Sequence, residues 1–173
     1  RENDIPMMRS VYRARVRSVR GAAETAKAWC EMAAFERQSA GDDDAAIGAY
    51  QDALDADAQC DPALIGLAEL LLLHNRQETI PTLADVMIER FDAGVDDVIR
   101  QDFSLYLGQL QMERANMALA AGTGTEAEAV SAQVLEILAT GYERAPHLRD
   151  LAQMYADHLY TRGQLVAAGR IYD

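Results

Sequence analysis

The chain has 173 residues, half of them hydrophobic, which is enough to bury the core of one domain. Its net charge is −12, with six arginines among residues 1–20 before an acidic remainder of about −16, and such a remainder repels nucleic acid. No apolar run approaches the roughly 18–20 residues that cross a membrane, so no transmembrane segment is expected.

The composition predicts an all-α fold. Alanine and leucine dominate, and the β-branched residues are scattered. Alanine loses no side-chain entropy in a helix, so this composition favours helix over strand. Short breakers separate segments of roughly 10–25 residues whose apolar residues recur every three or four positions. Because short loops make consecutive helices antiparallel neighbours, helical hairpins are predicted.

The first predicted element is a helix over residues 5–24, which contains the arginine-rich stretch "MMRSVYRARVRSVRG". The spacing of Tyr12, Val16 and Val19 favours this helix, and a strand in which apolar residues alternate with arginines stays the alternative. The arginines are spread around the helix. We therefore favour a solvated helix. A helix packed on the acidic residues that follow, and a site for an acidic surface, a membrane or nucleic acid, stay the alternatives.

Helices are predicted next near 26–39 and 44–57, and the aspartate-rich stretch "GDDDAAIGAYQDALDADAQCDP" spans the second of them. A calcium loop of the EF-hand type needs glycine at position 6 and glutamate at position 12. Counted from Asp55, these positions hold Cys60 and Gly66, so the loop does not fit. Asp42–Asp44 are predicted instead to cap the start of a helix. No metal site is expected.

Further helices are predicted near 61–74 and 78–91, at about 96–121 and 126–144, and at 148–161 and from 164 onward. The stretch "AGTGTEAE" lacks the lysine and the preceding strand of a phosphate-binding loop. Thr125 and Glu128 form a predicted capping box that begins the helix at 126.

No catalytic residue is predicted, and the chain is not expected to be an enzyme or to bind a cofactor. The three histidines lack the HxxxH and HExxH spacings of metal sites, and no serine or cysteine has an acid–base partner nearby in the sequence. Cys30 and Cys60 are predicted to be small packing residues. They do not reveal the redox compartment.

The predicted hairpins share a period of 34 residues. Small residues recur at positions 8, 20 and 27 of this period and an aromatic residue at position 24, as in Ala46, Tyr50, Ala53, Ala68, Ala156, Ala168 and Tyr172. Ala46 and Ala168, at position 20, are expected at close helix contacts. The stretches "DDAAIGAYQDALDADAQCDP" and "HLYTRGQLVAAGRIYD" match best. This pattern resembles the tetratricopeptide repeat family.

The resemblance implies a right-handed α-solenoid of antiparallel hairpins, in a single domain over 1–173 that is a fragment of a longer array. Its repeats would be 5–24 (the second helix of a preceding repeat), 27–60, 61–94, 95–148 (elongated and irregular) and 149–173 (truncated). Trp29 stands one place before position 4, which indicates a one-residue insertion near 42–44.

In this family the concave face of the solenoid binds a protein or peptide segment, so the resemblance implies a non-catalytic interaction scaffold. Positions 5, 9 and 12 give the candidate binding residues Glu31, Phe35, Gln38, Ile65, Glu69, Leu72, Gln153, Asp157 and Tyr160. The lysine and asparagine that clamp a peptide carboxylate in some family members are absent from these positions. An acidic and apolar groove favours a basic or amphipathic segment.

Two alternatives stay open. One is a ligand-sensing helical-repeat domain of a signalling or transcription regulator, and the other is an architectural subunit of a large envelope or multiprotein complex. In each case the chain is expected to be part of a larger chain or complex. The cytoplasm is favoured as its location, and the periplasm stays open if a signal peptide lies upstream.

Overall fold

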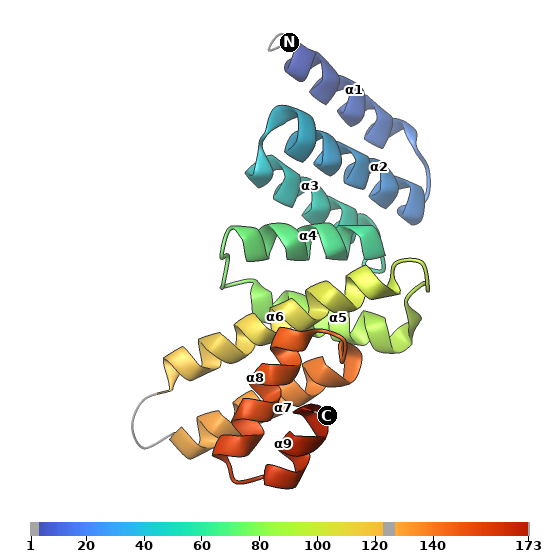
Figure 1. Cartoon of the computed structure of the whole chain (residues 1–173). Coiled ribbons are helices and arrows are strands. Elements are labelled where there is room, and N and C mark those ends of the chain that lie inside the picture. The colour runs from blue at the N-terminus through green and yellow to red at the C-terminus, as the bar shows by residue number, and fades with distance from the viewer. Residues whose placement is uncertain (1–3, 123–126, 173) are drawn as a thin grey trace. The chain divides into compact units, whose positions relative to one another are not determined.

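The structure of the protein is a computed structural model, which describes residues 4–122 and 127–172. Every regular element within these two ranges is helical (Figure 1). The predicted all-α fold is therefore confirmed. Among the described helices, none combines the length and the hydrophobicity that spanning a lipid bilayer requires.

The chain divides into two compact units, Arg1–His74 and Asn75–Asp173, which we call the N-terminal unit and the C-terminal unit. Their boundary falls inside the predicted repeat 61–94, between its two helices. The single domain, the continuous solenoid and the pairing of 61–74 with 78–91 therefore stay predictions. Each unit is described by itself.

In the N-terminal unit, consecutive helices pack on one another: α1 on α2, α2 on α3, and α3 on α4 (Figure 1). The elements are α1 (Asp4–Ser18), α2 (Ala22–Phe35), the π-helical turn η1 (Glu36–Ala40), α3 (Asp43–Ala56) and α4 (Asp61–Leu73). Ala46 is completely buried in α3, as expected for its position in the repeat. A small side chain there lets α3 approach its neighbour closely.

The arginine-rich helix is shorter than predicted. α1 ends at Ser18, and residues 22–24, which the prediction included in this helix, already belong to α2. Gly21 lies between the two helices with a φ of 93°, a conformation that costs glycine little and other residues much more. The single glycine thus ends one helix and redirects the chain into the next.

The position of Trp29 predicts one extra residue in the first repeat, and the structure has a π-helical turn, η1, in that repeat. A π-helical turn has i→i+5 hydrogen bonds and therefore accommodates one residue more than an α-helical turn. This turn covers Glu36–Ala40, slightly before the predicted insertion near 42–44. Gly41 ends it in the left-handed conformation, with a φ of 68°, and its N–H donates to the carbonyl of Glu36.

The aspartate cluster that follows η1 begins α3, as predicted. The Asp42 side chain accepts a hydrogen bond of 3.0 Å from the backbone N–H of Ala45. Asp43 and Asp44 occupy the first turn of the helix, where the positive end of the helix dipole favours carboxylates.

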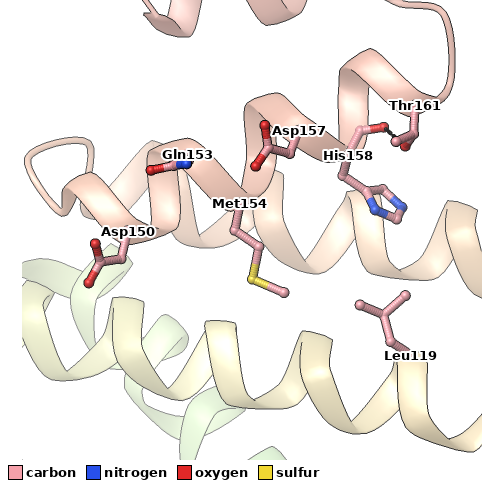
Figure 2. Close-up of a pocket in the computed structure, with 7 residues that line it drawn as sticks. All are labelled: Leu119, Asp150, Gln153, Met154, Asp157, His158 and Thr161. Carbon is pink, nitrogen blue, oxygen red and sulfur yellow. Dashed lines mark hydrogen bonds between the residues drawn. The ribbon is translucent and has the colours of Figure 1, made fainter.

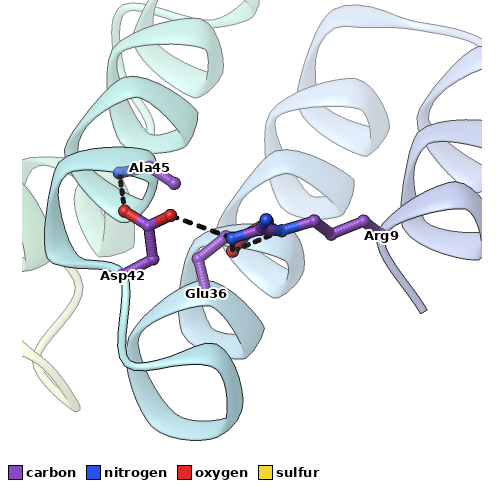
Figure 3. Close-up of polar contacts among 4 residues, drawn as sticks. All are labelled: Arg9, Glu36, Asp42 and Ala45. Carbon is purple, nitrogen blue, oxygen red and sulfur yellow. Dashed lines mark hydrogen bonds and ion pairs between the residues drawn. The ribbon is translucent and has the colours of Figure 1, made fainter. Parts of the chain in front are cut away.

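Arg9 of α1 binds both Asp42 and Glu36, which joins α1 to the start of α3 and to η1 (Figure 3). Its Nη2 lies 2.7 Å from Glu36 Oε2 and 2.9 Å from Asp42 Oδ2. The Glu36 side chain is only 1% exposed. A carboxylate at that depth requires a bound cation, so this pair fixes α1 on the unit.

Replacing Arg9 by methionine is therefore expected to destabilise the N-terminal unit, because the buried Glu36 carboxylate loses its cation while most of the side-chain volume is kept. Thermal unfolding followed by circular dichroism measures the effect. Arg13→Met, at an exposed arginine of the same helix, is the control. The loss should shrink when Glu36→Gln is already present, and equal losses in both backgrounds would contradict this role of the pair.

The C-terminal unit contains the two elongated helices predicted between 95 and 148. Its elements are α5 (Ile80–Gly94), α6 (Arg100–Ala121), α7 (Ala127–Arg144), α8 (Arg149–Thr161) and α9 (Leu165–Tyr172). Each helix packs on the next, and α6 also contacts α8. Ala168, the second small residue expected at a helix contact, is buried in α9. The predicted capping box begins at Thr125, which lies outside the described residues.

Glycines bring α6, α7 and the start of α8 close together. A Cβ atom on Gly108 would lie 2.8 Å from Leu148, and one on Gly141 would lie 3.0 Å from Gln111. Beside these contacts lies an apolar core formed by Ala115, Val134, Ile137, Leu138, Ala145 and Leu151. The core holds α8 against α6 and α7, with one face of α8 turned toward the C-terminal half of α6.

Candidate functional site

The two glutamates predicted for the binding surface of the N-terminal unit form ion pairs within the unit. Glu31 lies 2.9 Å from Arg15 of α1. Glu69 forms a two-bond pair with Arg37, at 2.5 and 2.6 Å. The hydrogen bonds from Arg37 lower the pKa of Glu69. Binding a basic partner through these carboxylates would first require breaking the existing pairs.

Phe35, expected as an apolar residue of the groove, is instead a core residue. It is 8% exposed, and its ring lies 5.0 Å from that of Tyr12 in α1. The repeat pattern did not predict that α1 covers the face of α2 that carries Phe35. The remaining predicted residues of this unit differ in exposure: Gln38 is exposed in η1, whereas Ile65 and Leu72 are half-buried in α4.

In the C-terminal unit, Gln153 and Asp157 line a pocket of about 400 Å³ (Figure 2). The other lining residues are Leu119, Asp150, Met154, His158 and Thr161. Tyr160, the third residue predicted here, is 63% exposed and does not line it. The structure thus brings two of the nine predicted residues together in a concave site.

The pocket arises from the period of α8. Its lining residues on that helix recur three or four positions apart, the spacing that places side chains on a single helix face. Figure 2 shows Met154 extending from α8 toward α6, and Leu119 extending from α6 toward α8. These two side chains make an apolar floor between the helices.

Carboxylates flank this apolar floor. Asp150 and Asp157 stand two turns apart on α8, both exposed to solvent. Within the described residues, neither of them forms an ion pair. Asp157 does accept a hydrogen bond from the Tyr172 hydroxyl of α9, and this bond raises the pKa of Tyr172. The pocket therefore combines an apolar floor with a negatively charged rim.

His158 closes one side of the pocket and joins α8 to α7. Its Nε2 lies 3.0 Å from the Ser131 carbonyl oxygen and 3.1 Å from the Ser131 hydroxyl. A protonated Nε2 donates to the carbonyl, and the same nitrogen then cannot accept the hydroxyl proton as a general base. The pair joins α7 to α8.

Two further pockets contain ion pairs within the protein. In the N-terminal unit, a pocket of about 420 Å³ contains Arg9 together with Glu36 and Asp42, which bind one another. In the C-terminal unit, a pocket of about 480 Å³ contains Arg144, whose guanidinium binds Asp92 at 2.7 and 3.0 Å. In the pocket on α8, neither Asp150 nor Asp157 forms such an ion pair within the described residues.

No model of a known protein family matches the chain, and no curated protein matches it. The likeness to tetratricopeptide repeats therefore depends on the residues of the sequence themselves.

Proposed function

We propose that this chain is a non-catalytic protein-interaction scaffold of helical repeats, in which the pocket on α8 binds a basic or amphipathic segment of a partner protein. The observation that supports this most is the apolar floor of Met154 and Leu119 between the solvent-facing carboxylates of Asp150 and Asp157. The tetratricopeptide resemblance supports it independently, since that family binds peptide segments on the concave face of its solenoid.

The two parts of the pocket would contribute to binding in different ways. An apolar side chain of the partner that displaces water from Met154 and Leu119 would supply most of the affinity. Arginine or lysine residues beside this anchor would face Asp150 and Asp157. Exposed charge pairs of this kind chiefly raise the association rate, and they weaken as salt is added.

The proposed binding surface lies in the C-terminal unit, whereas the residues predicted from the sequence are spread over both units. Glu31 and Glu69, the acidic residues first considered, already neutralise arginines of their own unit. Asp157 and Gln153 remain from the predicted set, and Asp150 and Met154 join them. The preferred partner keeps the same chemistry, an apolar anchor flanked by cations.

Selection from a random displayed peptide library tests the proposal without requiring that the natural partner be identified first. The selected peptides are expected to carry arginine or lysine around an aliphatic or aromatic residue. Removing both rim charges with Asp150→Asn and Asp157→Asn should weaken binding of such a peptide about tenfold at low salt, because two exposed ion pairs of up to about 1 kcal/mol are lost. The difference should narrow at high salt.

Glu89→Gln with Glu136→Gln is the matched control, because it removes two exposed carboxylates from α5 and α7 of the same unit. This variant should bind the selected peptide like the unchanged protein. If the two double variants lose affinity equally, net charge and not the pocket determines binding. Selection of acidic or uncharged peptides would contradict the proposed partner chemistry.

A further inference from the structure

The two cysteines of the chain meet in the fold. Cys30 lies in α2 and Cys60 immediately before α4, yet their Sγ atoms are only 3.6 Å apart. Both are free thiols, and both are half-buried. Thirty residues separate them along the chain, and the hairpin of α2 and α3 brings them together.

The surroundings favour a reactive thiolate on Cys60. Cys60 is the N-cap residue of α4, where the positive end of the helix dipole stabilises negative charge. The hydrogen bond with the Cys30 thiol lowers the pKa of Cys60 to about 7. Burial and the nearby carboxylates of Asp57 and Asp61 act in the opposite direction.

Cys30 has the complementary role. Its hydrogen bond to Cys60 and its burial raise the pKa of Cys30, and the charge of Glu31 adds to this. Of the two thiols, Cys60 is therefore the one favoured to ionise, with Cys30 as its neighbouring thiol. An attacking thiolate next to a second thiol is the arrangement that exchanges with disulfides.

We propose that Cys30 and Cys60 form a redox site that reacts with small-molecule disulfides of the glutathione class and closes a reversible disulfide between α2 and the start of α4. The two sulfurs must approach one another by about 1.5 Å to reach bonding distance. Cys60 lies immediately before the first turn of α4, at the end of the short loop that follows α3.

The reaction has two exchange steps. The Cys60 thiolate attacks one sulfur of the small disulfide, so that a mixed disulfide forms and the first small thiolate leaves and takes up a proton from water. Cys30 then releases its proton, and its sulfur attacks the Cys60 sulfur. The Cys30–Cys60 bond forms as the second small thiolate leaves and is protonated. The protein loses two electrons, and the small disulfide is reduced to two thiols.

Mass spectrometry of the reduced chain after incubation with glutathione disulfide tests this site. The chain should lose two hydrogen atoms and its reactivity toward alkylating reagents, and it should release two molecules of glutathione. Cys30→Ser should stop at the first step and retain one glutathione on Cys60. If the unchanged chain ends with bound glutathione and no internal disulfide, the proposal is wrong.

The order of attack has its own test. Serine keeps a hydroxyl that can donate to the neighbouring sulfur, so each single variant preserves much of the local hydrogen bonding. At neutral pH, Cys60 in Cys30→Ser should react with glutathione disulfide about tenfold faster than Cys30 in Cys60→Ser, because its thiolate fraction is larger. Equal rates would overturn the assignment of Cys60 as the attacking residue.

Oxidation should also raise the melting temperature of the unchanged chain, because the closed loop reduces the entropy of the unfolded state. This rise should disappear when a strong thiol reductant is added, and both serine variants should lack it. An oxidised chain with a lower melting temperature would show that the disulfide distorts the unit, which contradicts a site adapted to close reversibly.

Discussion

Replacing Phe103 by alanine is expected to lower the stability of the C-terminal unit by about 3–5 kcal/mol, the range typical of a buried aromatic ring. Phe103 lies in the first turns of α6 and is completely buried. Its ring contacts that of Phe91 in α5, with 6.3 Å between the ring centres. Alanine would lose this contact and leave a cavity between α5 and α6.

Chemical denaturation of the purified protein measures this loss as a lower free energy of unfolding. Val98→Ala is the control, because Val98 stands just before α6 with 89% of its surface exposed, and its loss should change stability by less than about 0.5 kcal/mol. A loss below about 1 kcal/mol for Phe103→Ala would mean that the helices close over the cavity or do not pack there.

Two glycines of the N-terminal unit are expected to respond in opposite directions to the same substitution. A Cβ atom on Gly66 of α4 would lie 2.3 Å from the Cζ atom of Tyr50, whose ring is buried on α3. Gly66→Ala should therefore destabilise the unit by about 1–3 kcal/mol through overpacking. Gly48 of α3 has open space at the Cβ position, so Gly48→Ala should stabilise it by about 0.5–1 kcal/mol.

The opposite signs separate a steric cause from a general effect of helix propensity, since alanine favours helix at both positions. Equilibrium unfolding of the two variants under the same conditions makes the comparison. Tyr50→Leu should reduce the cost of Gly66→Ala, because the shorter side chain leaves room for the new methyl group. Stabilisation by alanine at both glycines would contradict the close approach of α3 and α4.

Local patterns predicted the helices well. Glycine and proline breakers and apolar spacing located the helices from α3 to α9 to within a few residues, because these signals act within one or two turns. Asp42 was identified as a cap for the same reason. The first helix was predicted to extend to residue 24, whereas Gly21, with its positive φ, separates two helices.

Contacts between distant residues were not predictable from one sequence. The approach of Cys30 to Cys60, the pair of Arg37 with Glu69 and the burial of Phe35 each depend on how helices far apart in the sequence pack. The pair of Arg9 with Glu36 agrees with the alternative that the first helix packs on the acidic residues that follow it. Periodicity identifies the face of a helix that is apolar, but not the neighbour that covers it. For that reason Phe35 was predicted in a groove and lies in the core.

The candidate site was predicted in part. The repeat pattern selected Gln153 and Asp157, and both line the pocket on α8. It did not select Asp150 or Met154, because only positions 5, 9 and 12 of each repeat were carried over. It did not select Leu119, because the irregular stretch 95–148 has no equivalent repeat. Leu119 comes from that stretch, on the long helix α6.

A nuclear magnetic resonance titration of the isotope-labelled protein with a selected basic peptide tests directly whether the pocket on α8 is the binding site. The largest shifts are expected at the backbone amides of Gln153, Met154 and Asp157 in α8 and of Leu119 in α6, and they should be much smaller in the Asp150→Asn, Asp157→Asn variant. Shifts confined to the exposed face of α7, at Ala132, Gln133 and Glu136, would contradict the pocket on α8 as the binding site.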